Sequence, residues 1–335
     1  MRSRHTLFII AALLLSLAAP QKPAAQDVLP SFSEWLDSVR AEALARGVRQ
    51  EIVDQALGGI TEPLAVAIER DRAQPETVLS LEAYIARRVR VATVRTGQQM
   101  LRRHRALLNR VFDAYRVPPS ILVAIWGLES NFGRLTGVQP TFAVLATLAW
   151  DPRRSDFFRQ ELFSALDILN RGDIEPVRMR SSWAGAMGQP QFMPTSYLEY
   201  AVDFDGDGRR DIWDSPADIF ASIANYLKEH GWTASQRWGR EVIVPRGRQI
   251  EVARREGRCP AARNMSVGLP LEEWQRLGVS LPGGRPLPKA AFPAFLVSGS
   301  RRRFLVYGNY DTLLAYNCAH AYALSVALLA DRIGN

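Results

Sequence analysis

An acidic run, residues 203–214, has the composition of a calcium-binding loop. It places oxygen-bearing residues at positions 1, 3, 5, 9 and 12 and a glycine at position 6, which is how an EF-hand-like loop surrounds Ca²⁺. We predict a structural Ca²⁺ site, because a shell of hard oxygen ligands leaves no evident route from the ion to a substrate. The alternative is a solvated acidic turn. The expected ligands are Asp203, Asp205, Asp207, the carbonyl of Arg209 and, at position 12, Asp214.

A single glutamate, Glu129, lies near the end of a predicted apolar helix over residues 121–131. Desolvation by apolar neighbours and the negative end of the helix dipole would both raise its pKa. A carboxyl that stays protonated near neutral pH is what general-acid cleavage of a glycosidic bond requires. Taken alone, however, a glutamate near a helix end is more often a solvated surface residue.

A segment rich in glycine, residues 184–194, lies between these two features. Gly185 and Gly188 would allow a sugar chain to approach the backbone closely, and the flat pair Gln191 and Phe192 suits the same approach. Amide groups there could hydrogen-bond the hydroxyls and N-acetyl groups of the sugar. The alternative is a tightly packed Gly/Ala segment with Phe192 in the core. The residue types leave both interpretations open.

The whole chain has 335 residues, of which 47% are hydrophobic and 23% charged, so we expect a globular protein of two or three domains. Residues 1–25 are predicted to be a secretory signal peptide, since basic residues precede an apolar stretch over 7–19 that is short for a membrane span. This leader has no cysteine for lipid attachment. We therefore expect a soluble periplasmic protein without a transmembrane segment.

The net charge of +8 favours an anionic partner, and cell-wall polymer fits an exported protein better than nucleic acid does. The two cysteines, Cys259 and Cys318, could form a disulfide in an oxidising compartment or remain as two buried thiols. We expect no organic cofactor and take a monomer as the default. Proteins of cell-wall synthesis or division are conceivable partners.

The periodicity predicts a mainly α, α+β fold. A helix is expected over residues 31–47, followed by further helices to residue 115. Short strand-like runs occur at 242–244, 295–297 and 304–307, among prolines that mark loops. The predicted divisions are an N-terminal helical portion at 26–115, a catalytic core at 116–235, a small β-containing portion at 236–309, and a C-terminal helix over 310–335 that returns to the core.

Several ordered motifs together resemble the lytic transglycosylase B family. The motifs are ESNFG at 129–133, SWAGAMG at 182–188, QFMP at 191–194, VDFDGDG at 202–208, ANY at 224–226, HGW at 230–232, YN at 316–317 and YALSV at 322–326. Motifs in this order are far more specific than any one of them, and the resemblance extends over most of the chain after the leader.

The resemblance implies a lysozyme-like core that contains the Ca²⁺ loop. It also implies cleavage of the β-1,4 MurNAc–GlcNAc bond of peptidoglycan without water, which leaves a 1,6-anhydro-MurNAc end. Glu129 would be the sole acid and base. The family's longer metal loop points to Asp218 as an alternative closing ligand. The groove residues implied by the motifs are Ser182, Gln191, Phe192, Tyr226, Tyr316, Asn317 and Tyr322, although any single tyrosine is more often part of a core.

Two other functions remain open at this stage. A hydrolytic muramidase would use Glu129 with a water molecule and would need a second carboxylate at a defined distance. Asp151 and Asp156 are the nearest candidates for that role, and we expect both to be surface acids. A non-catalytic scaffold that binds peptidoglycan would retain the groove, but the presence of Glu129 in its motif argues against it.

Overall fold

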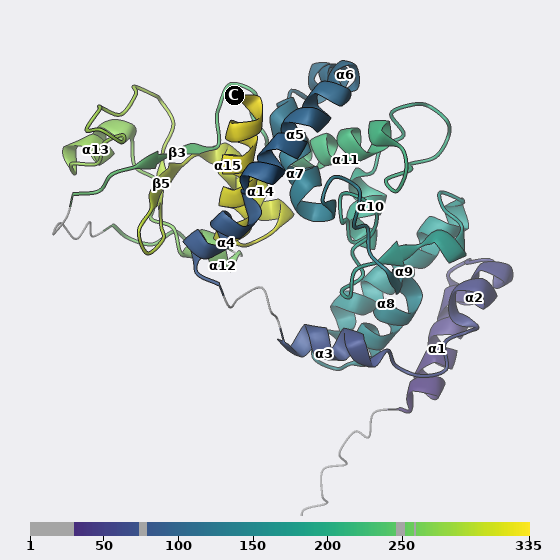
Figure 1. Ribbon diagram of the computed structural model, residues 1–335. Helices are drawn as coiled ribbons and strands as arrows, with labels where there is room; N and C mark the ends of the chain where they lie inside the picture. Colours follow the sequence, from purple (N-terminus) through teal and green to yellow (C-terminus); the bar gives the residue numbers. More distant parts are fainter. Residues whose placement is uncertain (1–29, 74–78, 246–251, 258) are drawn as a thin grey trace, which may run out of the picture.

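Helix α7, Pro119–Ser130, lies at the centre of the larger hydrophobic core (Figure 1). Pro119 at its first position is compatible with a helix start, because the missing N–H would have had no partner there. The side chains of Ile121 to Trp126 are all buried, so this helix is apolar on every side. Helix α15, His320–Gly334, packs along it. The computed structural model describes residues 30–73, 79–245, 252–257 and 259–335, and the predicted signal peptide lies outside these ranges.

The helices before α7 pack on two different parts of the molecule (Figure 1). The first three contact α8 and α9, whereas the next three contact α7, α11 or α15. A capping box between Ser31 and Glu34 begins α1, one residue after the predicted start at 31. The bounds are α1 Phe32–Ala45, α2 Gln50–Leu57, α3 Ala65–Ala73, α4 Leu81–Arg88, α5 Val91–Arg103, α6 Arg105–Tyr115, α8 Thr141–Trp150 and α9 Ser155–Arg171.

Two small antiparallel sheets complete the fold, which confirms the predicted α+β class. One is a pair, β1 Gln139–Pro140 with β2 Arg180–Ser181. The other has the strand order β3-β5-β4, with Gly239 opposite Val306 and Phe295 opposite Val306. The remaining elements are η2 Pro176–Arg178, α10 Pro194–Tyr200, α11 Pro216–Glu229, β3 Gly239–Val242, α12 Pro260–Arg263, α13 Leu271–Arg276, β4 Phe295–Ser298, β5 Arg303–Val306 and α14 Gly308–Tyr316.

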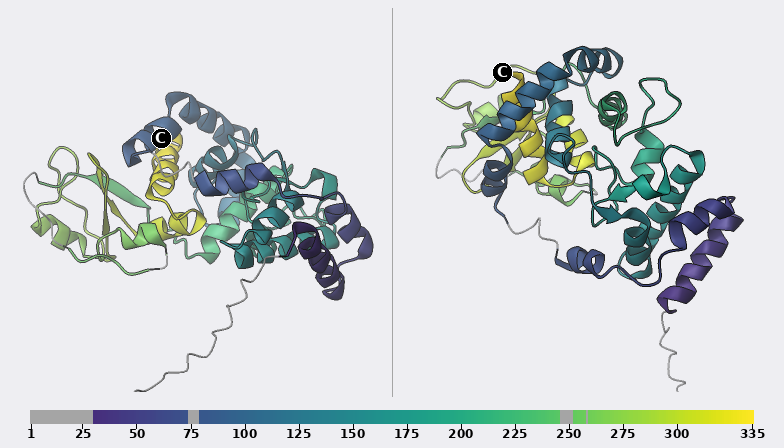
Figure 2. Two further views of the ribbon diagram at one scale, coloured as in Figure 1. Left: turned by 90° about the horizontal axis from the view of Figure 1, so that it is seen from below. Right: turned by 45° about the vertical axis from the view of Figure 1, so that its right-hand side comes forward.

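The three-stranded sheet has a hydrophobic core of its own, centred on Trp274, Leu305 and Tyr307. Figure 2 shows this sheet at one end of the molecule and α1 and α2 at the other, with α14 and α15 between them. The strand-like runs predicted at 295–297 and 304–307 correspond to β4 and β5. The chain then returns to the larger core through two helices, α14 and α15, where a single helix over residues 310–335 was predicted.

The sheet is attached to the helical part through α4. The carboxylate of Glu82 accepts hydrogen bonds from the backbone N–H of Arg301 at 2.8 Å and of Arg302 at 3.1 Å, and from the hydroxyl of Ser300 at 2.9 Å. These bonds lower the pKa of Glu82 to about 2. Over the described residues, no single helix is long and apolar enough to cross a membrane. Only the pair α14 and α15 passes this test of length and composition, and it does so across a 117° bend.

Candidate active site

Glu129 lies in the last turn of α7 and is half-buried, whereas its neighbours Leu128 and Ser130 are buried. The helix ends at Asn131, which adopts a left-handed conformation with φ 51°. The Ser130 hydroxyl donates to the carbonyl of Trp126 at 3.0 Å and accepts from the N–H of Gly133 at 3.0 Å. This turn, which carries Glu129, is therefore held by local hydrogen bonds.

The pKa of Glu129 is raised to about 7. Desolvation by burial is the largest cause, because the charged carboxylate would lose its hydrating water and is therefore disfavoured. The Tyr322 hydroxyl and the Arg88 guanidinium oppose the shift, since both favour the charged form. No carboxyl is among the groups that shift its pKa. Glu129 is therefore protonated over a broad range up to neutral pH, as a general acid must be.

The aromatic residues implied by the motifs form one cluster beside Glu129. The ring centroids of Phe192 and Tyr226 are 5.6 Å apart, those of Tyr226 and Tyr316 are 4.9 Å apart, and Tyr316 stacks on Tyr322 at 6.3 Å. Glu129 contributes to raising the pKa of both Tyr316 and Tyr322, after desolvation. The structure thus places side chains from α11, α14 and α15 around the end of α7.

These aromatic residues are not equally available to a ligand. Phe192 is 2% exposed and lies beneath the tyrosines, so it supports the cluster from the core. The hydroxyl of Tyr226 donates to the carbonyl of Ala315 at 2.8 Å, and that of Tyr316 donates to the carbonyl of Pro190 at 2.7 Å. Among the described residues, the buried hydroxyl of Tyr322 has no hydrogen-bond partner other than the Glu129 carboxyl, whose pKa it lowers. That hydroxyl can therefore bond a sugar hydroxyl or the Glu129 carboxyl.

Ser182 and Gln191 hold the glycine-rich segment in shape. The Ser182 hydroxyl accepts from the N–H groups of Ala184 at 3.3 Å and Ala186 at 3.2 Å. Gln191 adopts a left-handed conformation with φ 54°, and its side chain donates to the carbonyls of Gly188 at 2.9 Å and Thr136 at 3.3 Å. Both side chains are half-buried, so each retains some access to a ligand.

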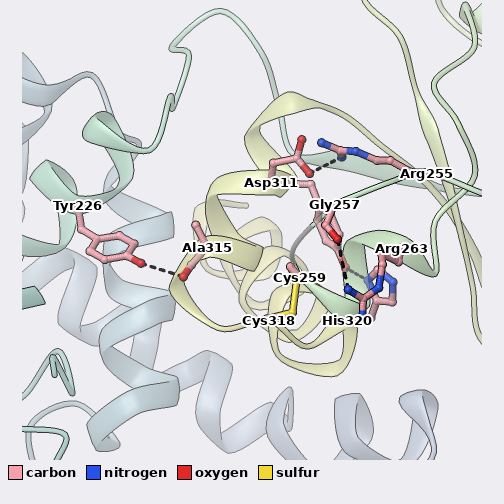
Figure 3. Close-up of a disulfide and its surroundings, with 10 residues drawn as sticks. Tyr226, Arg255, Gly257, Cys259, Arg263, Asp311, Ala315, Cys318 and His320 are labelled. Atoms are coloured by element: carbon pink, nitrogen blue, oxygen red, sulfur yellow. Dashed lines mark hydrogen bonds and ion pairs between the residues drawn. A yellow bond between two sulfur atoms is a disulfide. The ribbon is translucent and has the colours of Figure 1, made fainter. Parts of the chain in front are cut away.

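Asn317 is exposed at the corner between α14 and α15. The next residue, Cys318, forms a disulfide with Cys259, with their Cα atoms 5.7 Å apart (Figure 3). Figure 3 also shows the hydrogen bond from Tyr226 to Ala315, on the side of α14 that faces α11. The corner that carries Tyr316 and Asn317 is thus tied both to α11 and to the segment before α12.

Sequence reasoning did not single out Arg88 of α4 or the residues that connect α7 to the acidic loop. Arg88 of α4 donates to the carbonyl of Leu128, at the negatively polarised end of α7. The indole N–H of Trp126 donates to the Gln189 side chain at 2.6 Å, and Gln189 in turn donates to the carbonyl of Trp213 at 2.6 Å. Gln189 lies inside the glycine-rich segment 184–194, whereas no motif pointed to Arg88.

The acidic loop brings three carboxylates together. One oxygen each of Asp203, Asp205 and Asp218 lie within 4.8 Å of one another. Asp218 is fully buried, and its oxygens accept from the N–H groups of Phe204 and Asp211, both at 2.7 Å. Burial and the nearby charge of Asp205 raise the pKa of Asp218. A buried carboxylate beside two others fits a hard cation, because a cation would offset both desolvation and mutual repulsion.

Two other predicted carboxylate ligands, Asp207 and Asp214, are not part of this group. The carboxylate of Asp207 bonds the N–H of Arg209 at 2.9 Å and pairs with its guanidinium at 3.2 Å. The carboxylate of Asp214 pairs with Arg178 and is exposed. Between the two proposed closing acids, the structure therefore brings Asp218 to the cluster and turns Asp214 away from it.

Of the two candidates for a second catalytic carboxylate, one is buried and bonded to an arginine, and the other is exposed. Asp151 is buried, and its carboxylate bonds the N–H and side chain of Arg153 at 3.0 and 3.2 Å. The expectation that Asp151 is a surface acid was therefore wrong, because an ion-pair cluster covers it. Asp156 is exposed in the first turn of α9, as expected. Neither acid shifts the pKa of Glu129.

Comparison with known proteins places the chain in a family. Residues 31–331 match the model of the Transglycosylase SLT domain, so the chain belongs to this family. Membrane-bound lytic murein transglycosylase B of Escherichia coli (strain K12) is 44% identical over 140 residues, which cover 42% of this chain and 38% of that relative. The matched stretch thus spans well under half of the relative. The resemblance to the lytic transglycosylases is confirmed.

Solved structures agree with this assignment over most of the chain. SltB3 from Pseudomonas aeruginosa, in complex with NAG-anhNAM-pentapeptide, is 43% identical with a TM-score of 0.83, covering 91% of this chain and 80% of that one. The Escherichia coli lytic transglycosylase Slt35, in complex with calcium, is 26% identical with a TM-score of 0.72, covering 89% and 92%. The predicted lysozyme-like fold is confirmed by these lytic transglycosylases.

Proposed function

We propose that this protein is a lytic transglycosylase that cleaves the β-1,4 MurNAc–GlcNAc bond of peptidoglycan and leaves a 1,6-anhydro-MurNAc end. The observation that carries this proposal is the setting of Glu129. Its pKa is raised to about 7, and a tyrosine and an arginine act on it without any second carboxyl. The relative SltB3 was captured with NAG-anhNAM-pentapeptide, a ligand that contains an anhydro sugar.

One carboxyl can perform both proton transfers because they occur in sequence. Protonated Glu129 first donates its proton to the oxygen that links the two sugars, and the bond from that oxygen to C1 of MurNAc breaks. The C6 hydroxyl of the same ring then attacks C1, and the Glu129 carboxylate takes its proton. The products are a free GlcNAc hydroxyl and a 1,6-anhydro ring. Glu129 ends protonated, and no water is consumed.

The test is mass spectrometry of peptidoglycan digested by the protein and by its Glu129→Gln variant. We expect products one water lighter than hydrolysed muropeptides, and a rate about 10²–10⁴-fold lower for the variant, since that is the usual contribution of a general acid. Products with a free reducing end would instead establish a hydrolytic muramidase. Equal turnover by the variant would show that Glu129 is not the acid.

We further propose that Asp203, Asp205 and Asp218 hold a structural Ca²⁺ ion. Their convergent oxygens support this, and the relative Slt35 has been solved in complex with calcium. The ion would neutralise the cluster next to Ile212 and Trp213, whose carbonyls bond Gln189. The hydrogen bond that the Trp126 indole N–H donates to the Gln189 side chain then connects the loop to α7. The ion's role in this proposal is to stabilise the loop, and Glu129 performs the chemistry.

Removal of metal tests the calcium proposal. Ca²⁺ at 100 times its dissociation constant should add about 2.7 kcal/mol to the free energy of unfolding, and a chelator should reverse this. Asp218→Asn should abolish the increase because it removes a cluster oxygen. Asp214→Asn is the matched control, and it should retain the increase. If the Ca²⁺-dependent increase in the free energy of unfolding were lost in both variants, or kept in both, the proposed ligand set would be contradicted. Thermal melts with and without Ca²⁺ provide the measurement.

Export to the periplasm also remains our proposal. It is supported by the predicted signal peptide over residues 1–25 and by relatives that are named as murein transglycosylases. The N-terminal sequence of the protein recovered from an osmotic-shock fraction would test it. A mature chain that begins near residue 26 is the expected result, whereas an intact N-terminus in the cytoplasmic fraction would contradict it.

A further inference from the structure

A hollow of about 300 Å³ borders Glu129 on the side of α4 and α5. Arg87 and Arg88 line it from the end of α4, and Arg90 lines it from the residue that precedes α5. Helix α5 packs against α7 (Figure 1), and Arg88 at the end of α4 reaches the carbonyl of Leu128, next to Glu129. The other lining residues are Thr93, Gly127, Leu128, Asn131 and Leu135.

The charge of this hollow, which we call the arginine pocket, is unbalanced. Glu129 is its only acidic lining residue, and Glu129 carries a proton at pH values below its raised pKa. Arg87 and Arg90 are exposed, and within the described ranges neither forms an ion pair. Arg88 donates to the carbonyl of Leu128, but it keeps its full positive charge. The pocket therefore has a net positive charge next to the proposed reacting bond.

The surrounding fold holds the backbone that carries the arginines. Between them, Val89 is buried, and its carbonyl accepts a hydrogen bond at 2.9 Å from Arg332 of α15. Glu82, one turn before the pocket, is bonded to the β4–β5 turn and so does not neutralise the arginines. A ligand would therefore meet guanidinium groups on a fixed backbone, and guanidinium groups are suited to carboxylates.

We propose that the arginine pocket binds a carboxylate of the stem peptide attached to the MurNAc ring at the bond to be cleaved. This inference rests on the proposed function. The N-acetylated sugars of an intact glycan strand are neutral, so the ionised groups of peptidoglycan lie in its peptides. Each peptide is attached at the lactyl group of MurNAc. In the proposed function, this is the ring whose bond at C1 is broken with Glu129 as the acid. A pocket that borders Glu129 is therefore within reach of that peptide.

The test compares two substrates that differ only in charge: native peptide-bearing strands, and the same strands with their peptide carboxylates amidated. We expect the wild-type protein to cleave native strands with a kcat/KM about 10-fold higher. Tenfold corresponds to about 1.4 kcal/mol, which one charge-assisted hydrogen bond can supply. This preference should decrease as salt is added, because exposed guanidinium groups are screened.

The double variant Arg87→Gln/Arg90→Gln should lose most of this preference. Arg95→Gln is the matched control, because Arg95 is also an exposed arginine of α5 but does not line the pocket. The single variants R87Q and R90Q should each lose part of the preference, and they provide the same comparison if the double variant is unstable.

The outcomes separate this inference from the proposed function. Equal cleavage of native and amidated strands by the wild-type protein, or an unchanged preference in the double variant, would overturn the arginine pocket and leave the transglycosylase proposal intact. A loss of preference in R95Q as large as in the double variant would also overturn the pocket, because it would show a general charge effect. Failure of the wild-type protein to cleave either substrate would overturn both proposals.

Discussion

Glu129 combines two demands that conflict in most surface carboxyls. It must remain protonated near neutral pH, yet it must reach a polymer that approaches from solvent. The structure meets both demands because the residue is half-buried at the last turn of a buried helix, with Tyr322 and Arg88 preventing a still larger rise of its pKa. The proposed chemistry therefore depends on residues from three helices, α4, α7 and α15.

The raised pKa of Glu129 predicts a dependence of stability on pH. The folded carboxyl holds its proton up to about pH 7, whereas the unfolded one releases it near 4.5. The folded state therefore binds more protons, and stability falls as the pH rises from 4.5 to 7. Glu129→Gln should raise the free energy of unfolding by about 1–3 kcal/mol at pH 8 and have little effect at pH 4. Denaturant unfolding at the two pH values would measure this. A variant that is equally destabilised at both would contradict it.

We predict that removing the Tyr322 hydroxyl shifts the pH dependence of kcat/KM. Its hydroxyl lowers the pKa of Glu129, so Tyr322→Phe should raise that pKa. Activity requires the protonated acid, and the alkaline limb of the profile for kcat/KM should move to higher pH. Tyr226→Phe is the comparison, because that hydroxyl bonds Ala315 and does not act on Glu129. An unshifted limb in Y322F would mean that the hydroxyl does not contact the carboxyl.

Among the elements, the α14–α15 corner matters most for the aromatic cluster. It supplies Tyr316 and Asn317, and α15 supplies Tyr322. The Cys259–Cys318 disulfide joins this corner to the chain 59 residues earlier. Sequence reasoning left this pair open between a disulfide and two thiols. The fold brings the two cysteines together because α12 contacts α14.

Loss of the disulfide should therefore affect both stability and the site. We expect Cys259→Ser/Cys318→Ser to lower the free energy of unfolding by about 2–4 kcal/mol, the usual effect of opening a loop of this kind. The KM for peptidoglycan should also rise, because Asn317 adjoins Cys318. Melting curves and kinetics of the oxidised, reduced and double-variant proteins would test this. If reduction changed neither quantity, the corner would be held by packing alone.

For the molecule as a whole, the small sheet and the helical core are connected directly, because α14 follows β5. Glu82 adds a second connection by accepting three hydrogen bonds from residues 300–302. Its own helix, α4, also carries Arg87 and Arg88. The carboxylate that anchors the sheet and the arginines beside Glu129 therefore share one short helix.

Glu82→Gln should loosen the turn between β4 and β5. The pKa of Glu82 is lowered to about 2, so its contribution is complete above the unfolded value of 4.5 and is lost as the pH falls through about 2. Because the side chain is partly exposed, we expect a cost of only about 1 kcal/mol at neutral pH. Hydrogen exchange at residues 299–302 should accelerate in E82Q but not in Glu69→Gln, an exposed glutamate of α3. Unchanged exchange would show that the turn does not need Glu82.

The local pattern of the chain was sufficient to predict several features. The apolar helix that ends near Glu129, the acidic loop and the strands β4 and β5 could all be recognised, because periodicity, caps and ligand spacing are properties of neighbouring residues. The motifs implied Tyr316 and Tyr322 as companions of Glu129, but their sequence distance from it gave no physical reason for contact.

Other features depend on segments that are far apart in the chain. Arg88 reaches Leu128 across 40 residues, and Asp218 rather than Asp214 joins Asp203 and Asp205. Asp151 is covered by an ion pair with the distant Arg72 as well as with Arg153. Burial, pKa and ligand choice are set by which helices pack together. The spacing of the acidic residues therefore predicted the cation loop, and the motifs of the resemblance implied Glu129 as the proposed acid. Only the packing of α4, α11, α14 and α15 around α7 decided their surroundings.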